Sequence, residues 1–314
     1  MVSSVILLVI GFIILIKGAD LFVDGASSMA QNFKLSKMLI GLTIVSFGTS
    51  APEFAVSITS ILSGKGDIVL GNVVGSNILN ILLILGVSSM FHFLRVKNST
   101  IKKEIPITIL MTAVLFVLMN DSLINGTKNT FTRADGIIII LFFCVFVYYL
   151  ISMMRNKVDE ETTIKYGVLK SIILTVVGIA CIIIGSNFVV NSATEIATIL
   201  GISERIISLT IVALGTSLPE LVTSVVATKK GEYDIAIGNV VGSNIFNIGI
   251  VLGVPVAIFG TIHNISFQFI DLIVMLLCPI LLYFFSRKDQ KIGKTSGLIF
   301  LSIFVLYYGY IILN

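Results

Sequence analysis

Two short polar motifs stand inside strongly apolar stretches, and each of them occurs twice in the chain. Residues 48–53 read Gly-Thr-Ser-Ala-Pro-Glu, and residues 215–220 read Gly-Thr-Ser-Leu-Pro-Glu. Residues 71–77 read Gly-Asn-Val-Val-Gly-Ser-Asn, and residues 238–244 repeat these letters unchanged. Both motifs recur at an offset of 167 residues, so the chain encodes one unit of structure twice. Because carboxylate, hydroxyl and amide oxygens are the donors that hard cations prefer, the motifs indicate chemistry with an ion such as calcium or sodium.

The candidate ligands share helical faces. Thr49 and Glu53 are four residues apart, and so are Ser76 and Asn80 in the next apolar segment. Pro52 lacks an N–H and clashes with the carbonyl four residues earlier, so we expect a bent helix with backbone oxygens turned inward. The second half repeats the pattern. The candidate cation ligands are Glu53, Glu220, Thr49, Ser50, Thr216, Ser217, Ser76, Ser243, Asn80 and Asn247, together with the backbone oxygens of Ser46 and Ala213.

The cost of burying charge favours a function for the two glutamates. An ionised carboxylate at the centre of a membrane helix costs about 2.5–3.5 kcal/mol on insertion scales, so two of them call for a neutralising cation. The alternative, protonated glutamates that only join helices, does not explain why the hydroxyls and the proline recur in register. The repeated glycines are more simply explained by helix packing. For the remaining motif amides two roles stay open, ion contact or cross-linking of helices; these are Asn72, Asn77, Asn239 and Asn244.

Three other charged residues are not repeated. Lys17, Asp20 and Asp24 lie at the end of the first apolar stretch, and the matching positions of the second half are uncharged. We expect them to snorkel to the membrane interface or to pair with one another there, rather than to form a transport site.

The composition identifies an integral membrane protein. Hydrophobic residues make up 56% of the 314 residues, charged residues only 12%, and the mean hydropathy is +1.07. A soluble chain of this length could not cover its surface with so little charge. Three separated cysteines and two isolated histidines predict neither a soft-metal site nor a catalytic triad, so we expect no cofactor and no enzyme. The partners predicted are calcium, sodium and the lipid bilayer, with no nucleic acid and no obligate protein partner.

The elements that must position the motifs are membrane-spanning helices. Five per half are predicted, so the second half enters the membrane from the opposite side. The fold class is therefore all-α integral membrane, with ten transmembrane helices as two inverted five-helix repeats that bring Glu53 and Glu220 together near the midplane. The repeats are 1–154 and 169–314, joined by a linker at 155–168. The predicted spans are 3–24, 37–63, 67–91, 104–119, 134–154, 169–192, 206–228, 235–259, 267–286 and 296–313.

The basic residues predict the orientation of the chain. With the N-terminus outside, 16 of the 21 lysines and arginines fall in the inner connections. The positive-inside rule then places both termini outside the cell and the linker in the cytoplasm of a multi-pass protein of the cell membrane. We interpret the first apolar stretch as a retained helix, because it has no basic n-region.

The paired motifs resemble the two alpha repeats of the cation/calcium exchanger superfamily, and most closely its prokaryotic sodium/calcium exchangers. Proton-coupled calcium exchangers of this superfamily typically carry Gly-Asn-x-x-Glu where this chain has Gly-Thr-Ser-x-Pro-Glu. The resemblance covers the whole ten-helix layout and implies an antiporter that exchanges three sodium ions for one calcium by alternating access. It implies that Glu53 and Glu220 coordinate calcium, and that Ser46 and Ala213 lend backbone oxygens to sodium.

Asn247 departs from some members of this superfamily, including potassium-dependent exchangers, which have aspartate at the matching position. An amide supplies an oxygen but no charge, so we expect that the chain does not require potassium. Coupling to protons or potassium and a passive cation channel remain as alternatives. An intramembrane hydrolase is a distant third, because no nucleophile–base pair or aspartate dyad motif occurs.

Overall fold

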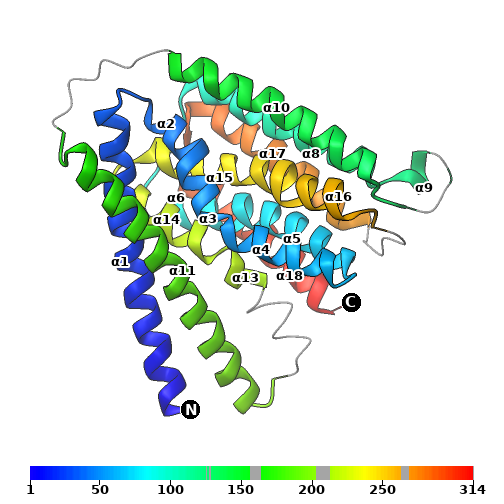
Figure 1. The fold of residues 1–314 in the computed structure, drawn as a ribbon, viewed down its shortest axis with the longest axis horizontal. Coiled ribbons are helices and arrows are strands. Elements are labelled where there is room, and N and C mark those ends of the chain that lie inside the picture. Colours follow the sequence, from blue (N-terminus) through cyan, green and yellow to red (C-terminus); the bar gives the residue numbers. More distant parts are fainter. Residues whose placement is uncertain (125, 127–128, 156–163, 203–212, 263–268, 314) are drawn as a thin grey trace.

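The computed structural model describes residues 1–124, 126, 129–155, 164–202, 213–262 and 269–313, and this part is helical almost throughout (Figure 1). The first half contains α1 (Val2–Asn32), α2 (Lys37–Ile40), η1 (Gly41–Val45), α3 (Ser46–Thr49), α4 (Ala51–Leu62), α5 (Gly66–Leu79), η2 (Asn80–Leu85), α6 (Gly86–Phe91), β1 (Leu94–Arg95), α7 (Asn98–Lys102), α8 (Glu104–Leu118), α9 (Asp121–Ile124) and α10 (Arg133–Arg155). The second half contains α11 (Val168–Ile199), α13 (Ala213–Thr216), α14 (Leu218–Lys229), α15 (Tyr233–Phe246), η4 (Asn247–Leu252), α16 (Gly253–Phe259), α17 (Phe269–Asp289), β2 (Lys291–Ile292) and α18 (Lys294–Leu313).

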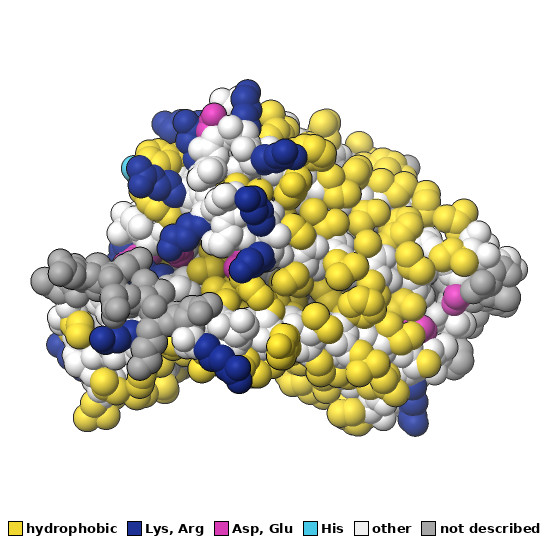
Figure 2. Space-filling view, turned by 90° about the horizontal axis from the view of Figure 1, so that it is seen from above, with side chains coloured by type: hydrophobic (Ala, Val, Ile, Leu, Met, Phe, Trp, Pro, Cys, Tyr) yellow, Lys and Arg dark blue, Asp and Glu magenta, His cyan; other side chains and the backbone are white. Residues whose placement is uncertain are grey.

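The chain is a multi-pass membrane protein. Among the described residues, seven helices are long and apolar enough to cross a membrane, and an eighth span results if the bent pair α2–α4 is counted as one. Apolar side chains cover much of the surface in Figure 2, while lysine and arginine gather towards one end. The seven helices are Val2–Asn32, Gly66–Phe91, Arg133–Arg155, Val168–Ile199, Tyr233–Phe259, Phe269–Asp289 and Lys294–Leu313.

Two predicted helix ends were wrong. Helix α1 continues to Asn32 and α11 to Ile199, whereas the sequence analysis ended them at residues 24 and 192. The polar residues near positions 24 and 192 were interpreted as the membrane boundary. Because no proline follows them closely, nothing ends the helix there, and both helices extend beyond the apolar stretch. The beginning of the predicted segment 206–228 and most of the linker 155–168 lie outside the described residues.

Helices α1 and α11 pack side by side in antiparallel directions along one flank of the molecule (Figure 1). Glycines line this contact at equivalent positions of the two halves. A Cβ atom at Gly18 would lie 2.6 Å from Cβ of Cys181, and a Cβ atom at the equivalent Gly185 would lie 2.6 Å from the backbone nitrogen of Leu15. Only glycine lets the two backbones approach this closely.

The stretches α5–η2–α6 and α15–η4–α16 form the core. In each of them 72% of the most apolar window is buried, against 28% for α1 and for α11. Both stretches change to π-helical winding at an asparagine, Asn80 in the first and Asn247 in the second. These two positions are again 167 residues apart. Because π-helical turns often accompany functional sites, the repeat of this irregularity marks the asparagines.

Each Gly-Thr-Ser-x-Pro-Glu motif interrupts a helix. Helices α3 and α4 meet at Ser50, and the segment Lys37–Thr49 is bent by 46° against Ala51–Leu62, so the predicted bend is confirmed. Helices α13 and α14 meet in the same way at Ser217. Pro52 and Pro219 fall in the first turn of the new helix, where a missing N–H costs little. Each glutamate then follows in the same turn, close to a helix N-terminus that favours negative charge.

Short extended segments join the two halves at both ends of the molecule. Leu94 of β1 pairs with Ile292 of β2 in antiparallel register, and an isolated bridge joins Phe131 to Ile262. These contacts were not predicted, and they are too short to change the helical class.

Candidate cation site

Glu53 and Glu220 converge in the interior, as the repeat predicted. Each side chain is only 1% exposed. The hydroxyl of Ser50 donates to Oε1 of Glu220 at 2.9 Å, and the hydroxyl of Ser217 donates to Oε1 of Glu53 at 3.4 Å. Each carboxylate is therefore held by a serine from the other half of the chain, and the two motifs build one site.

Several buried oxygens of this site make no hydrogen bond within the described residues. Oε2 of Glu53 and Oε2 of Glu220 are both buried and unbonded. The same holds for Oδ1 of Asn80, Oδ1 of Asn247 and the hydroxyl of Ser243. A buried polar atom left without a partner costs about 1–3 kcal/mol, so five of them among the predicted ligands require an explanation. All five carry lone pairs that a cation can accept.

The other predicted ligands lie around the glutamates. Ser217 Oγ is 3.4 Å from Ser76 Oγ, which brings α5 to the site. Thr49 and Ser243 lie beside Glu220, and Thr216 lies beside Glu53. The two Gly-Asn-Val-Val-Gly-Ser-Asn motifs thus lie against the two Gly-Thr-Ser-x-Pro-Glu motifs.

Two backbone oxygens near the helix breaks already have partners. The carbonyl of Ser46 accepts the N–H of Ser50 at 3.0 Å, so it is part of the helix rather than turned away from it. The carbonyl of Gly215, which Pro219 leaves without its helical donor, accepts the hydroxyl of Ser186 at 3.1 Å. Of Ala213, whose carbonyl was the matching candidate, the structure describes only that it begins α13.

Asn72 and Asn239 cross-link helices, one of the two roles left open for them. Asn72 Nδ2 donates to the carbonyl of Glu53 at 2.9 Å and to Ser57 Oγ at 3.1 Å. Asn239 Nδ2 donates to the carbonyl of Glu220 at 3.3 Å and to Ser224 Oγ at 2.9 Å. Sequence reasoning missed these serines, Ser57 and Ser224, although both follow a glutamate by four residues and recur at the same offset.

Asp20 and Asp24 form an ion-pair cluster, but their partners are lysines far away in the sequence and not the neighbouring Lys17. Lys230 reaches Asp20 at 2.8 Å and Asp24 at 2.6 Å, and Lys165 reaches Asp24 at 2.7 Å. The hydrogen bond to Asp24 raises the pKa of the Lys165 ammonium group above its ordinary value. Lys17, which was expected in this cluster, makes none of these pairs. The cluster fastens α1 to the end of α14 and takes no part in the central site.

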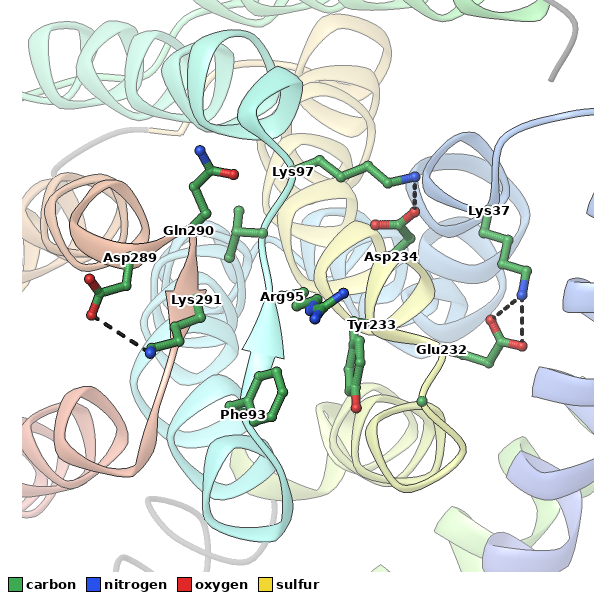
Figure 3. Close-up of a pocket in the computed structure, with 12 residues that line it drawn as sticks. Lys37, Phe93, Arg95, Lys97, Glu232, Tyr233, Asp234, Asp289, Gln290 and Lys291 are labelled. Atoms are coloured by element: carbon green, nitrogen blue, oxygen red, sulfur yellow. Dashed lines mark hydrogen bonds and ion pairs between the residues drawn. The ribbon is translucent and has the colours of Figure 1, made fainter. Parts of the chain in front are cut away.

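A surface hollow of about 860 Å³ lies near the β1–β2 ribbon and the start of α15 (Figure 3). Lys37 pairs with Glu232 at 2.8 Å on one side of it, and Lys97 pairs with Asp234 at 2.6 Å nearby. None of the twelve predicted ligands lines this hollow. It is a mixed-charge surface feature, separate from the buried glutamates.

The donor set suits a hard cation. Within the described ranges, no three histidine, cysteine, aspartate or glutamate side chains gather as a metal cluster. The central site has only two carboxylates, and its other donors are neutral hydroxyls and amides. Such oxygen ligands fit calcium or sodium, whereas softer metals prefer imidazole or thiolate.

A multi-pass helical protein with two carboxylates buried among neutral oxygens has the features of a membrane transporter for a hard cation. The chain belongs to the sodium/calcium exchanger protein family, whose model matches residues 3–152 and, separately, residues 170–313.

Full-length relatives share this architecture. The chain is 37% identical to the "Putative antiporter CaxA" of Alkalimonas amylolytica over 98% of both chains. It is 31% identical to the "Sodium/calcium exchanger MaX1" of Methanosarcina acetivorans over 96% of both. A structure of the sodium-calcium exchanger NCX_Mj, soaked with 2.5 mM Na+ and 0.1 mM Ca2+, matches with a TM-score of 0.84. That match has 31% identity and covers 98% of this chain and 97% of the other. The family and the fold are those of a cation/calcium antiporter rather than an enzyme.

Proposed function

We propose that this chain exchanges calcium for sodium across the cell membrane by alternating access at a central site built around Glu53 and Glu220. The observation that carries the proposal is the shared burial of these two carboxylates, each tied to a serine of the other half. Each also keeps one oxygen without a hydrogen-bond partner among the described residues. One calcium ion or two sodium ions would neutralise the pair, so one set of oxygens can serve either ion in turn.

The proposed ligands are the twelve predicted residues. The glutamates supply the charge, and the hydroxyls and amides complete the oxygen shell. The backbone oxygens of Ser46 and Ala213 are assigned to sodium on the resemblance alone. A third sodium ion would leave one positive charge in excess, so exchange at the family's ratio of three sodium ions per calcium is electrogenic.

The proposed architecture is ten spans in two inverted repeats, residues 1–154 and 169–314, with a cytoplasmic linker at 155–168. The separate match of the family model to each part supports two repeats, and so does the recurrence of the helix break at Ser50 and Ser217. In this arrangement α8 and the pair α13–α14 belong to the two spans that are not among the seven long helices or the bent pair. The excess of inner lysine and arginine supports extracellular termini.

Alternating access requires one group of helices to move against another. The helices that carry the motifs are the most buried, whereas α1 and α11 lie together on a flank and expose most of their apolar surface. We assign the movement to this pair, which would slide along the site and open it to one side at a time.

Uptake of radioactive calcium into liposomes containing the purified protein tests the proposal. The vesicles are loaded with sodium and diluted into buffer free of sodium and potassium at symmetric pH, beside a sample with sodium on both sides. We expect uptake only where a sodium gradient exists, and we expect Glu53→Gln to abolish it. Uptake driven by a pH gradient without sodium would move the assignment to proton coupling, and single-channel currents would make the protein a channel.

A further inference from the structure

Four asparagines form one connected hydrogen-bond network where the two halves meet. Asn80 Nδ2 donates to Oδ1 of Asn244 at 2.9 Å, and Asn247 Nδ2 donates to Oδ1 of Asn77 at 3.1 Å. Asn77 Nδ2 donates to the backbone carbonyl of Asn244 at 3.3 Å, and Asn244 Nδ2 donates to the backbone carbonyl of Asn77 at 3.4 Å. All four side chains are at most 2% exposed.

The backbone carbonyls fix the orientation of every amide in this network. A carbonyl only accepts hydrogen bonds, so the side chains of Asn77 and Asn244 must turn their NH2 groups towards it. Their Oδ1 atoms then face away from the carbonyls and require donors. The NH2 groups of Asn247 and Asn80 are these donors. Because the NH2 ends of Asn80 and Asn247 point to Asn244 and Asn77, their Oδ1 atoms must point away from these two partners.

These last two oxygens are among the buried atoms that have no hydrogen-bond partner within the described residues. Asn80 follows Ser76 by one helical turn, and Ser76 lies beside the serine that holds Glu53. The amide oxygen therefore belongs to the face of the helix that borders the carboxylates. The same relationship recurs in the second half for Ser243 and Asn247.

We propose that Asn77 and Asn244 are positioning residues that compel the amides of Asn247 and Asn80 to present oxygen, and not NH2, to the transported cation. An amide offers either end with almost the same shape, and its NH2 end would repel a cation. Each bracing asparagine comes from the opposite half, so each half sets the ligand orientation of the other.

This inference rests on the proposed function, and its test separates the two. The variant Asn80→Asp has nearly the shape of asparagine but carries oxygen at both ends, so its orientation no longer matters. Asn244→Ala removes the brace. We would measure equilibrium binding of radioactive calcium to purified wild type, to each single variant and to the double variant.

In the chain with Asn80, we expect Asn244→Ala to weaken calcium binding at least tenfold, because the amide is free to turn its NH2 group to the site. In the Asn80→Asp background, the same substitution should weaken binding less than twofold or strengthen it. In that background Oδ1 of Asn244 would face a carboxylate oxygen at position 80, and Asn244→Ala would remove the repulsion between these two oxygens. In exchange assays the loss should lie in the apparent calcium affinity, with the maximal rate largely kept.

Asn72→Ala is the matched control, since it removes a half-buried amide of the same motif, whose hydrogen bonds among the described residues go to Glu53 and Ser57 and not to Asn80 or Asn247. It should change calcium binding by the same factor in both backgrounds. The mirror cycle, Asn77→Ala with Asn247→Asp, repeats the test if a variant of the first cycle does not fold.

Equal factors for Asn244→Ala in both backgrounds would overturn the positioning role while leaving the exchanger intact. A coupled cycle together with absent sodium-driven uptake would uphold the positioning role and overturn the proposed exchange. If wild type binds no calcium, both are overturned.

Discussion

The hydroxyl of Ser50 lies 2.9 Å from Oε1 of Glu220, although the two residues are 170 positions apart in the sequence. Ser217 and Glu53 make the counterpart contact at 3.4 Å. The serine of each motif thus donates a hydrogen bond to the glutamate of the other half and not to the glutamate of the same motif. A cation bound between the carboxylates would draw on both halves at once, so neither half forms a complete site alone.

Neutralising either carboxylate should remove calcium exchange. Glu53→Gln and Glu220→Gln each halve the charge that the site can offer, and we expect sodium-driven calcium uptake to fall at least tenfold. The fold should persist, because glutamine is neutral and less costly to bury in a membrane. Uptake into liposomes and the thermal unfolding temperature of the same preparations measure the two effects.

The matched control for the glutamates is Asp20→Asn, which also removes one carboxylate charge from a helix. Asp20 lies within α1 and pairs with Lys230 at the end of α14, away from the central site. This variant should retain exchange. If a glutamate variant kept the wild-type rate, the central assignment would be wrong.

Loss of a bridging serine should weaken calcium binding without abolishing it. A hydrogen bond to a charged group contributes about 1.5–3 kcal/mol, so Ser50→Ala should raise the calcium concentration for half-maximal exchange roughly tenfold or more. Ser217→Ala should have the smaller effect, because its contact with Glu53 is longer. Ser302→Ala, on the exposed part of α18, is the control. A larger effect from Ser217→Ala than from Ser50→Ala contradicts the geometry.

The glycine contact between α1 and α11 should tolerate no side chain. Gly178→Val would place Cβ within 2.6 Å of the backbone of Phe22, and overpacking of this kind costs about 1–3 kcal/mol or more. We expect the unfolding temperature in detergent to drop by several degrees. Gly309→Ala is the control, because among the described residues no atom lies within 4 Å of the added Cβ. Equal unfolding temperatures for the two variants would show that α1 and α11 can separate freely.

Exchange should not require potassium. The two amides at Asn80 and Asn247 are neutral, so the site keeps the charge of two carboxylates, which calcium or sodium already balances. Replacing potassium by choline on both sides of the vesicle membrane should leave the initial rate of calcium uptake within about twofold. Uptake that stops without potassium and resumes when it is added back would contradict the role assigned to Asn247.

The sequence was sufficient to predict the helical membrane class and the meeting of Glu53 with Glu220. An apolar composition leaves few alternatives to membrane helices, and the repeated proline marks where each helix breaks. The ends of α1 and α11 were both underestimated, and in α1 the charged Asp24 looked like a boundary. Its partners, Lys165 and Lys230, come from distant parts of the chain.

Other features depend on contacts that no local pattern encodes. The π-helical turns at Asn80 and Asn247 arise within stretches whose composition is ordinary for a helix. The orientation of these amides depends on partners 164 and 170 positions away, so an asparagine in a motif could equally have been a ligand or a cross-link. In the structure Asn72 is a cross-link, whereas Asn80 has a buried oxygen that makes no hydrogen bond in the described part of the chain.

Lys230 offers a test of the movement assigned to α1. Its ammonium group contacts two aspartates of α1, so it fastens the flank helix to the end of α14. If α1 slides during transport, this contact must break once in every cycle. Partly exposed ion pairs contribute about 0.2–1 kcal/mol, so Lys230→Met should change the maximal exchange rate by up to about fivefold. The calcium affinity should stay constant, because the cluster does not reach the glutamates. Raising the salt concentration should reduce the difference between variant and wild type, since salt screens exposed charges.

The control for Lys230→Met is Lys291→Met, whose lysine pairs with Asp289 at 3.8 Å and not with either flank helix. Initial rates at saturating calcium measure the effect. A variant that loses calcium affinity instead of rate would place Lys230 in the site itself, and an unchanged rate would mean that α1 does not leave α14 during the cycle.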